Sequence, residues 1–109
     1  MQTLIKLTVA ANTTAEIVEL GFVPSKIRIT NRTSLATLEW NENLPAGYWY
    51  KTVAAGTRTL VTSAGPTVLD GSDKTNNLET SFGFNLPTQA DINDTLGEIL
   101  DIEASRDDI

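Results

Sequence analysis

A short alternating run sets the architecture of this chain: Gly21-Phe22-Val23-Pro24-Ser25-Lys26-Ile27-Arg28-Ile29-Thr30-Asn31. Proline lacks a backbone N–H, so Pro24 fits only at the edge or the start of a strand and predicts a corner before a strand that begins near Ser25. Polar and apolar side chains alternate from residue 26 to residue 30, which predicts that Ile27 and Ile29 face the core. The polar side chains between them then face water.

The same alternation recurs along most of the chain. Residues 2–10 predict a strand with Ile5, Leu7 and Val9 on one face, and residues 16–22 predict a second strand, with Val18, Leu20 and Phe22 facing inward and Glu16 facing outward. Further strands are expected at 37–40, 48–53, 58–63, before Leu69, at 80–86 and within 96–102, the last with a helical alternative. Residues 70–77 predict an exposed polar loop.

Turn signals follow one another about every 8 to 12 residues, a spacing typical of sandwiches and barrels. A chain of 109 residues has the size of one domain. We therefore predict an all-β fold, a single antiparallel β-sandwich of jelly-roll-like form that spans residues 1–109.

The charge is concentrated near the C-terminus. Residues 1–90 contain seven basic and seven acidic residues, whereas residues 91–109 contain seven acidic residues against Arg106 alone, which accounts for the whole net charge of −6. Such a segment disfavours nucleic-acid phosphates, which bind clustered Lys and Arg. We expect residues 91–109 to be either a solvated segment or a tail that docks on a basic partner surface.

Several kinds of chemistry have little support in the composition. The chain has no Cys and no His, which removes thiolate nucleophiles, imidazole bases and the commonest metal ligands. Residues 91–98 are rich in oxygen ligands but lack the order of a calcium-binding loop. No secretory signal or membrane-spanning run is recognisable in the sequence. We expect a non-enzymatic protein without a metal or cofactor, made and used without export.

Aromatic residues form the main candidate contact site. Tyr48, Trp49 and Tyr50 are consecutive, and Trp40 precedes them on the previous predicted strand. Alternation places Trp49 on the face opposite Tyr48 and Tyr50, so the trio cannot all lie in the core. These four residues predict either a surface that binds a protein partner or stacks on sugar rings, or core packing by Trp40 and one member of the trio.

The order of many small signals between residues 18 and 104 resembles small virion proteins of tailed bacteriophages. The resemblance is carried by Gly21–Asn31, Glu39-Trp40, Leu44-Pro45-x-Gly47, Lys51-Thr52, Gly56–Gly65, Asp70-Gly71, Gly83-Phe84-Asn85-Leu86 and Asp91-Ile92-Asn93. The residues from Leu96 onward depart most from the family, because they are more acidic than expected.

The resemblance implies a structural role in the virion, with the protein made in the host cytoplasm. The partner would be the major capsid protein, which a decoration (cement) protein would bind to stabilise the head, and a homo-oligomer, a dimer or trimer, is expected to raise avidity. Head-fibre or tail attachment is a second possibility. A displayed carbohydrate- or host-receptor-binding module is a third, and a carboxylate-based hydrolase has the weakest support. For the capsid role, residues 2–10 are expected to offer an edge strand that a capsid segment extends.

Overall fold

A computed structural model describes residues 2–71 and 81–107 of the chain. The described residues form the strands β1 (Gln2–Ala10), β2 (Glu16–Glu19), β3 (Lys26–Asn31), β4 (Thr37–Asn41), β5 (Trp49–Thr52), β6 (Arg58–Val61), β7 (Thr67–Asp70), β8 (Phe82–Leu86) and β9 (Ile99–Asp107). No helix occurs among these residues, so none of them belongs to a helix that could cross a membrane. The prediction of an all-β fold is confirmed.

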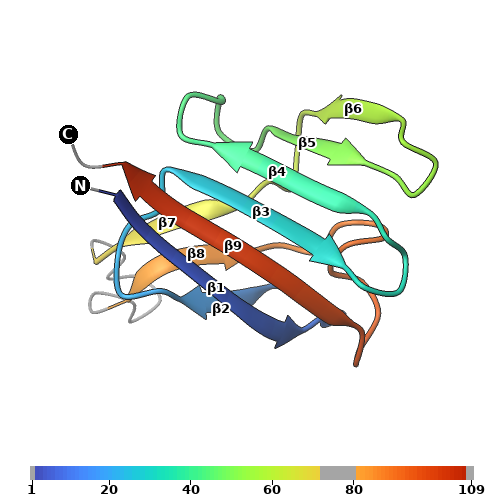
Figure 1. Ribbon diagram of the computed structural model, residues 1–109, viewed down its shortest axis with the longest axis horizontal. Coiled ribbons are helices and arrows are strands. Elements are labelled where there is room, and N and C mark those ends of the chain that lie inside the picture. Colours follow the sequence, from blue (N-terminus) through green and yellow to red (C-terminus); the bar gives the residue numbers. More distant parts are fainter. Residues whose placement is uncertain (1, 72–80, 108–109) are drawn as a thin grey trace.

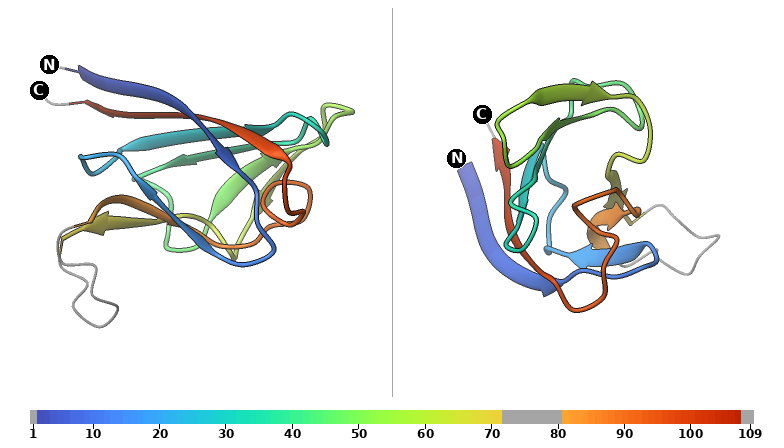
Figure 2. Two further views of the ribbon diagram at one scale, coloured as in Figure 1. Left: turned by 90° about the horizontal axis from the view of Figure 1, so that it is seen from below. Right: turned by 90° about the vertical axis from the view of Figure 1, so that its right-hand side faces the viewer.

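The strands form two antiparallel sheets, shown in Figure 1. The larger sheet has six strands in the order β1-β9-β3-β4-β5-β6, and the smaller has three in the order β2-β8-β7. Figure 2 shows the larger sheet curving over the smaller one. Every strand pairing is antiparallel.

The core lies between the two sheets. Ile27, Ile29 and Leu38 of the larger sheet are buried in one cluster with Phe84 and Leu86 of the smaller sheet. The alternation of β3 therefore places its isoleucines as predicted, with the polar side chains on the other side of the sheet. Burying side chains of this size stabilises the fold by about 1.5 to 3 kcal/mol each, before the entropy cost of ordering them.

One glycine permits the close pairing of β2 with β8. A Cβ atom on Gly83 would lie 2.0 Å from the backbone oxygen of Val18, which is far inside van der Waals contact. Any other residue at position 83 would have to push the two strands apart.

The orientation predicted for Glu16 is wrong. Glu16 pairs with Leu86 and Val18 pairs with Phe84, so both β2 side chains turn toward the core, as residues two apart along a strand must. Glu16 is half-buried, and its Oε1 is buried with no hydrogen-bond partner among the described residues. This burial raises the pKa of Glu16 above its ordinary value.

The acidic C-terminal segment is part of the sheet. Strand β9 lies between β1 and β3, and it pairs with β1 along its whole length and with β3 over residues 100–105. Leu100 and Ile102 are buried in the core, whereas Asp101 and Glu103 alternate with them on the other side. The interpretation of 91–109 as a solvated segment is therefore wrong for its described part, and the helical alternative for its apolar residues is wrong too.

The predicted polar loop at 70–77 falls mainly on residues 72–80, which lie outside the described residues. The other predicted strands are present, and β5, β6 and β8 are shorter than the sequence pattern indicates.

Candidate binding face

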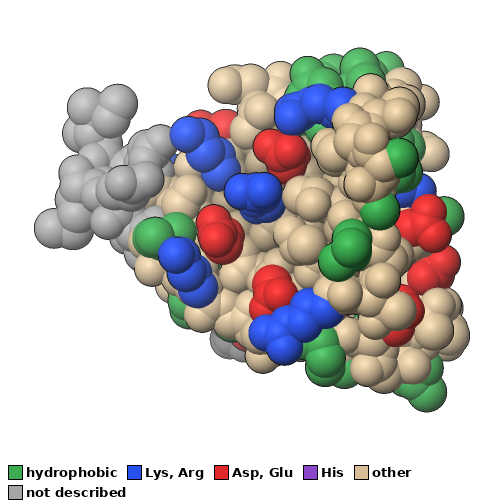
Figure 3. Space-filling view, turned by 45° about the vertical axis from the view of Figure 1, so that its right-hand side comes forward, with side chains coloured by type: hydrophobic (Ala, Val, Ile, Leu, Met, Phe, Trp, Pro, Cys, Tyr) green, Lys and Arg blue, Asp and Glu red, His purple; other side chains and the backbone are tan. Residues whose placement is uncertain are grey.

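The side of the six-stranded sheet that points away from the core, here called the outer face, carries an ordered row of charges. The register places Lys6 beside Glu103, Glu103 beside Arg28, and Arg28 beside Glu39. The row continues across β5 with Tyr50. Charges of opposite sign thus alternate over four neighbouring strands, because each strand contributes a residue from its polar face. Figure 3 shows basic and acidic side chains interspersed over the surface of the molecule.

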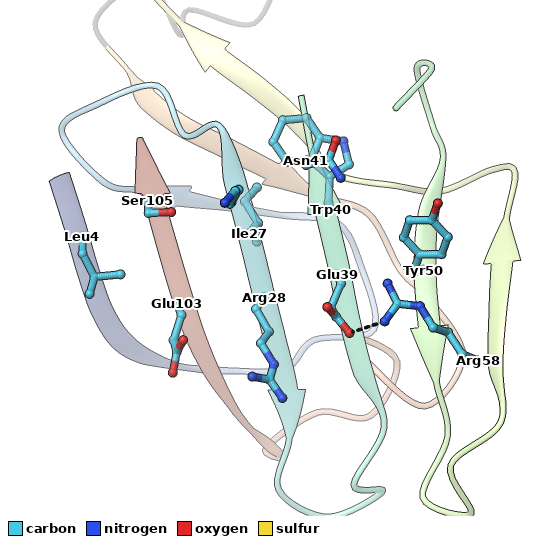
Figure 4. A pocket seen from close by; sticks show the side chains of 11 residues that line it. Leu4, Ile27, Arg28, Glu39, Trp40, Asn41, Tyr50, Arg58, Glu103 and Ser105 are labelled. Carbon is cyan, nitrogen blue, oxygen red and sulfur yellow. Dashed lines mark hydrogen bonds and ion pairs between the residues drawn. The ribbon is translucent and has the colours of Figure 1, made fainter. Parts of the chain in front are cut away.

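A groove of about 360 Å³ runs across the middle of this face. It is lined by Leu4, Lys26, Ile27, Arg28, Glu39, Trp40, Asn41, Tyr50, Arg58, Glu103 and Ser105. These residues come from β1, β9, β3, β4, β5 and β6, so the groove crosses the strands of the sheet (Figure 4). The lining combines three basic residues with two acidic ones.

Arg58 closes one end of the groove. Its guanidinium binds the Glu39 carboxylate at 3.1 Å and lies 4.4 Å from the centre of the Tyr50 ring. The second distance is that of a cation–π contact. One face of the Tyr50 ring is therefore already covered by a side chain of the same molecule.

Arg28, unlike Arg58, is not held by another side chain in the described part of the chain. It stands between Glu39 and Glu103 in the register, yet within the described part of the chain its side chain makes no hydrogen bond or ion pair. It is exposed in the groove, with its guanidinium between the two glutamates (Figure 4). An arginine placed in this way offers its donors to a carboxylate of another molecule.

The structure separates the four predicted contact residues. Trp49 is only 2% exposed, and its indole Nε1 donates a hydrogen bond to the Ser63 carbonyl oxygen at 2.8 Å. Trp40 is 9% exposed and belongs to the same core cluster. The alternative in which Trp40 and one member of the trio pack the core is thereby confirmed, and Trp49 is not a surface residue. Tyr48 is half-buried just before β5, and Tyr50 is half-buried in the groove.

The sequence analysis did not select the charged residues of the groove, which are Lys26, Arg28, Glu39, Arg58 and Glu103. The alternation of each strand already places such residues on a polar face. What brings them together is the order β9-β3-β4-β5-β6, which no local pattern contains.

Strand β1 lies at the edge of the six-stranded sheet, as expected for residues 2–10. It pairs with β9 on one side, and among the described strands none pairs with its other side. Lys6 is exposed on this edge strand, and an edge lysine is one way in which proteins limit uncontrolled strand pairing.

The oxygen-rich segment 91–98 uses its oxygens within the fold. An Asp91 carboxylate oxygen binds Lys51 at 3.2 Å, Asp94 accepts a hydrogen bond from the Asp91 backbone N–H at 3.1 Å, and Glu98 accepts one from Asn31 at 3.1 Å. Among the described residues, no group of three or more Asp, Glu, His or Cys side chains could hold a metal ion.

Comparison with protein-family models, curated proteins and solved structures found no match.

Proposed function

We propose that this chain is a non-enzymatic structural protein of a tailed-bacteriophage particle. It binds the major capsid shell as a decoration protein and stabilises the head. The resemblance of residues 18–104 to small virion proteins motivates this role. The exposed outer face, with its alternating charges and its groove, is the observation that carries it.

The outer face suits a protein partner better than a nucleic acid. Its basic and acidic side chains alternate, so the electrostatic potential changes sign from one strand to the next. A nucleic-acid phosphate backbone laid across it would be repelled as often as it is attracted. A protein surface can match such a pattern charge by charge, which gives specificity. Arg28 has no ion-pair partner among the described residues, so a substitution of this residue is the most direct test of the complementarity.

The open edge of β1 adds a second mode of contact. A capsid segment that pairs with it would continue the six-stranded sheet through backbone hydrogen bonds. Repetition of such modest contacts over a symmetric shell, and homo-oligomerisation as a dimer or trimer, would supply avidity. The finer fold description, a jelly-roll-like β-sandwich, is part of the same proposal and is supported by the core that the two sheets share.

Co-sedimentation with expanded capsids that lack the protein tests the proposal. The wild-type chain is expected to sediment with the particles and to saturate, and the charge-reversing variant Arg28→Glu is expected to bind at least tenfold more weakly. Glu19→Lys, which reverses an exposed charge on β2 of the smaller sheet, is the control and is expected to bind like the wild type. The capsid role is wrong if the wild-type chain stays in the supernatant at saturating concentration.

A carbohydrate- or receptor-binding module is the second candidate. Tyr50 is the aromatic residue that lines the groove from the exposed side, although Arg58 covers one face of its ring. Glycan binding that is lost in Tyr50→Ala, with capsid binding retained, would favour this candidate. Trp49→Ala is unsuitable for the test because removing a buried indole would leave a cavity. A reconstruction of the particle would distinguish the capsid surface from a head-fibre or tail position.

A further inference from the structure

Two exposed leucines lie in two loops that contact each other, outside the groove. Leu35 is 61% exposed and Leu96 is 72% exposed, the two highest values among the large apolar residues that the structure describes. They belong to the loops 31–36 and 91–98, here called the loop end, which lie at the right-hand end of the molecule in Figure 1. The two loops touch, because the Ser34 hydroxyl donates a hydrogen bond to the Asp91 carbonyl oxygen.

The backbone of Leu35 has an unfavourable conformation. Its φ of 61° lies in the left-handed region, and its N–H donates to the Asn31 carbonyl oxygen at 2.9 Å. Glycine or asparagine is the usual residue where a turn needs this conformation. A leucine that is 61% exposed gains little from burial within the chain, so folding alone does not explain it. Departures of this kind from local rules concentrate at functional positions.

The loop end holds its leucines on a rigid base. The buried Asn31 amide donates to the Ile92 carbonyl oxygen at 2.9 Å, and its oxygen accepts from the Thr33 N–H at 2.8 Å. The buried Asn93 amide donates to the Leu86 carbonyl oxygen at 3.3 Å and accepts from the Asn12 N–H at 2.7 Å. A surface fixed in advance loses little conformational entropy when it binds.

The charge of the loop end indicates what kind of surface it fits. The two loops contain Asp91, Asp94 and Glu98 against Arg32. With the ion-pair partners Lys51 and Asp101 included, the net charge is −4 + 2 = −2. Exposed apolar side chains with an acidic surround are complementary to an apolar recess with a basic border. A second copy of the same loop end would present the same sign and be repelled.

We infer that the loop end is an insertion site, in which Leu35 and Leu96 enter an apolar recess bordered by Lys and Arg side chains on the capsid shell. This inference rests on the proposed function but concerns a surface separate from the groove. The two surfaces would allow one molecule to contact the shell at two places.

Co-sedimentation of Leu35→Asn with expanded capsids tests the inference. Asparagine accepts the left-handed backbone, so the Tm is expected to equal or exceed that of the wild type. Binding is nevertheless expected to weaken about tenfold, because an apolar anchor is lost. Loss of binding without loss of stability is a result that a purely structural role of Leu35 would not produce. Binding as tight as that of the wild type would overturn the inference.

Leu96→Ser is the second variant, in the other loop, and is expected to weaken binding by a similar factor. Ile17→Thr, which removes an exposed apolar side chain from β2, is the matched control and is expected to bind like the wild type. If capsid binding weakened equally in the control and in the loop-end variants, the contact could not be assigned to the loop end. Absence of wild-type binding would refute the capsid role itself, whereas wild-type binding that both leucine variants retain would refute only the loop-end contact.

Discussion

The outer face is one side of the six-stranded sheet and the loop end consists of two loops that lead into its strands, and the two surfaces are stabilised in different ways. The outer face carries exposed charges, of which Arg28 has no ion-pair partner among the described residues and Glu39 has one on a neighbouring strand. The loop end is fixed by buried amides such as Asn31, whose donors and acceptor are all used. We therefore expect substitutions on the outer face to have small effects on the free energy of unfolding. Substitutions of the buried amides at the loop end should have large effects.

The largest effect is expected at Asn31. Asn31→Ala removes two donated and two accepted hydrogen bonds, and it leaves the carbonyl oxygen of the buried Ile92 without this donor. Leaving buried polar groups unpaired costs about 1 to 3 kcal/mol each, so we expect the free energy of unfolding to fall by about 3 kcal/mol. Urea denaturation followed by tryptophan fluorescence measures it.

Asn41→Ala is the control from the outer face. Asn41 lines the groove, and among the described residues its side chain makes one hydrogen bond, which its oxygen accepts from the Asn43 N–H at 3.0 Å. The same chemical change should therefore cost only about 0.5 to 1 kcal/mol. Equal losses in the two variants would contradict the difference drawn between the two surfaces.

The side chains that each strand turns outward were largely predictable from the sequence, whereas the row that they form across the sheet and the loop end were not. Alternation within residues 26–30 identifies which side chains of β3 are polar and exposed, and the structure confirms it. The loop 31–36, by contrast, reads only as a polar turn. Nothing local indicates that Asn31 reaches Ile92, sixty-one residues away, because that contact depends on where β9 is inserted.

The same limit explains the error over the acidic segment. A net charge counted over residues 91–109 gives one value for the whole segment and does not show how the residues alternate. In β9, Asp101 and Glu103 lie on the outer side of the sheet, whereas Leu100 and Ile102 lie on the core side. The pairing of β9 with β1 and β3 joins distant parts of the sequence, which periodicity does not report. The inward orientation of Glu16 was available from the two-residue period of a strand, since Val18 shares its face.

A gain in stability is expected from Ala64→Gly, and it sharpens the role given to Leu35. Ala64 has a φ of 63°, nearly the value of Leu35, but lies in the loop between β6 and β7. Relief of the left-handed conformation, less the added freedom of the unfolded chain, should raise the free energy of unfolding by about 0.5 to 1 kcal/mol. Capsid binding should not change. Weaker binding in this variant would show that relaxing a loop backbone alone impairs binding, which would weaken the case for the leucine side chain.

A smaller effect is expected for the ion pair between Glu39 and Arg58. Both side chains are partly exposed, so a double-mutant cycle with Glu39→Gln and Arg58→Gln should give a coupling free energy of about 0.3 kcal/mol, which decreases in high salt. Arg58→Gln also removes the contact with the Tyr50 ring, but this contribution cancels in the cycle. A coupling above about 2 kcal/mol would mean that the outer face is as tightly organised as the loop end.

The smallest effect is expected at the junction of the two surfaces, where Arg32 of the loop end binds Asp101 of the outer face through two hydrogen bonds of 2.7 and 2.8 Å. The hydrogen bond from Arg32 holds the pKa of Asp101 below its ordinary value of 3.8. A carboxylate with a lowered folded-state pKa stabilises the fold above its unfolded-state pKa, and this contribution is lost as the pH falls through the folded-state value.

Arg32→Ala should therefore be less stable than the wild type at neutral pH, and the difference should shrink as the pH falls below about 3.8, the ordinary pKa of Asp101. Urea denaturation at neutral and at acidic pH measures it. Arg28→Ala removes an arginine that has no carboxylate partner among the described residues, so its stability difference from the wild type should not show this dependence. If the stability difference from the wild type shrank equally at acidic pH in both variants, the pH effect would come from net charge. The ion pair between Arg32 and Asp101 would then make no separate contribution.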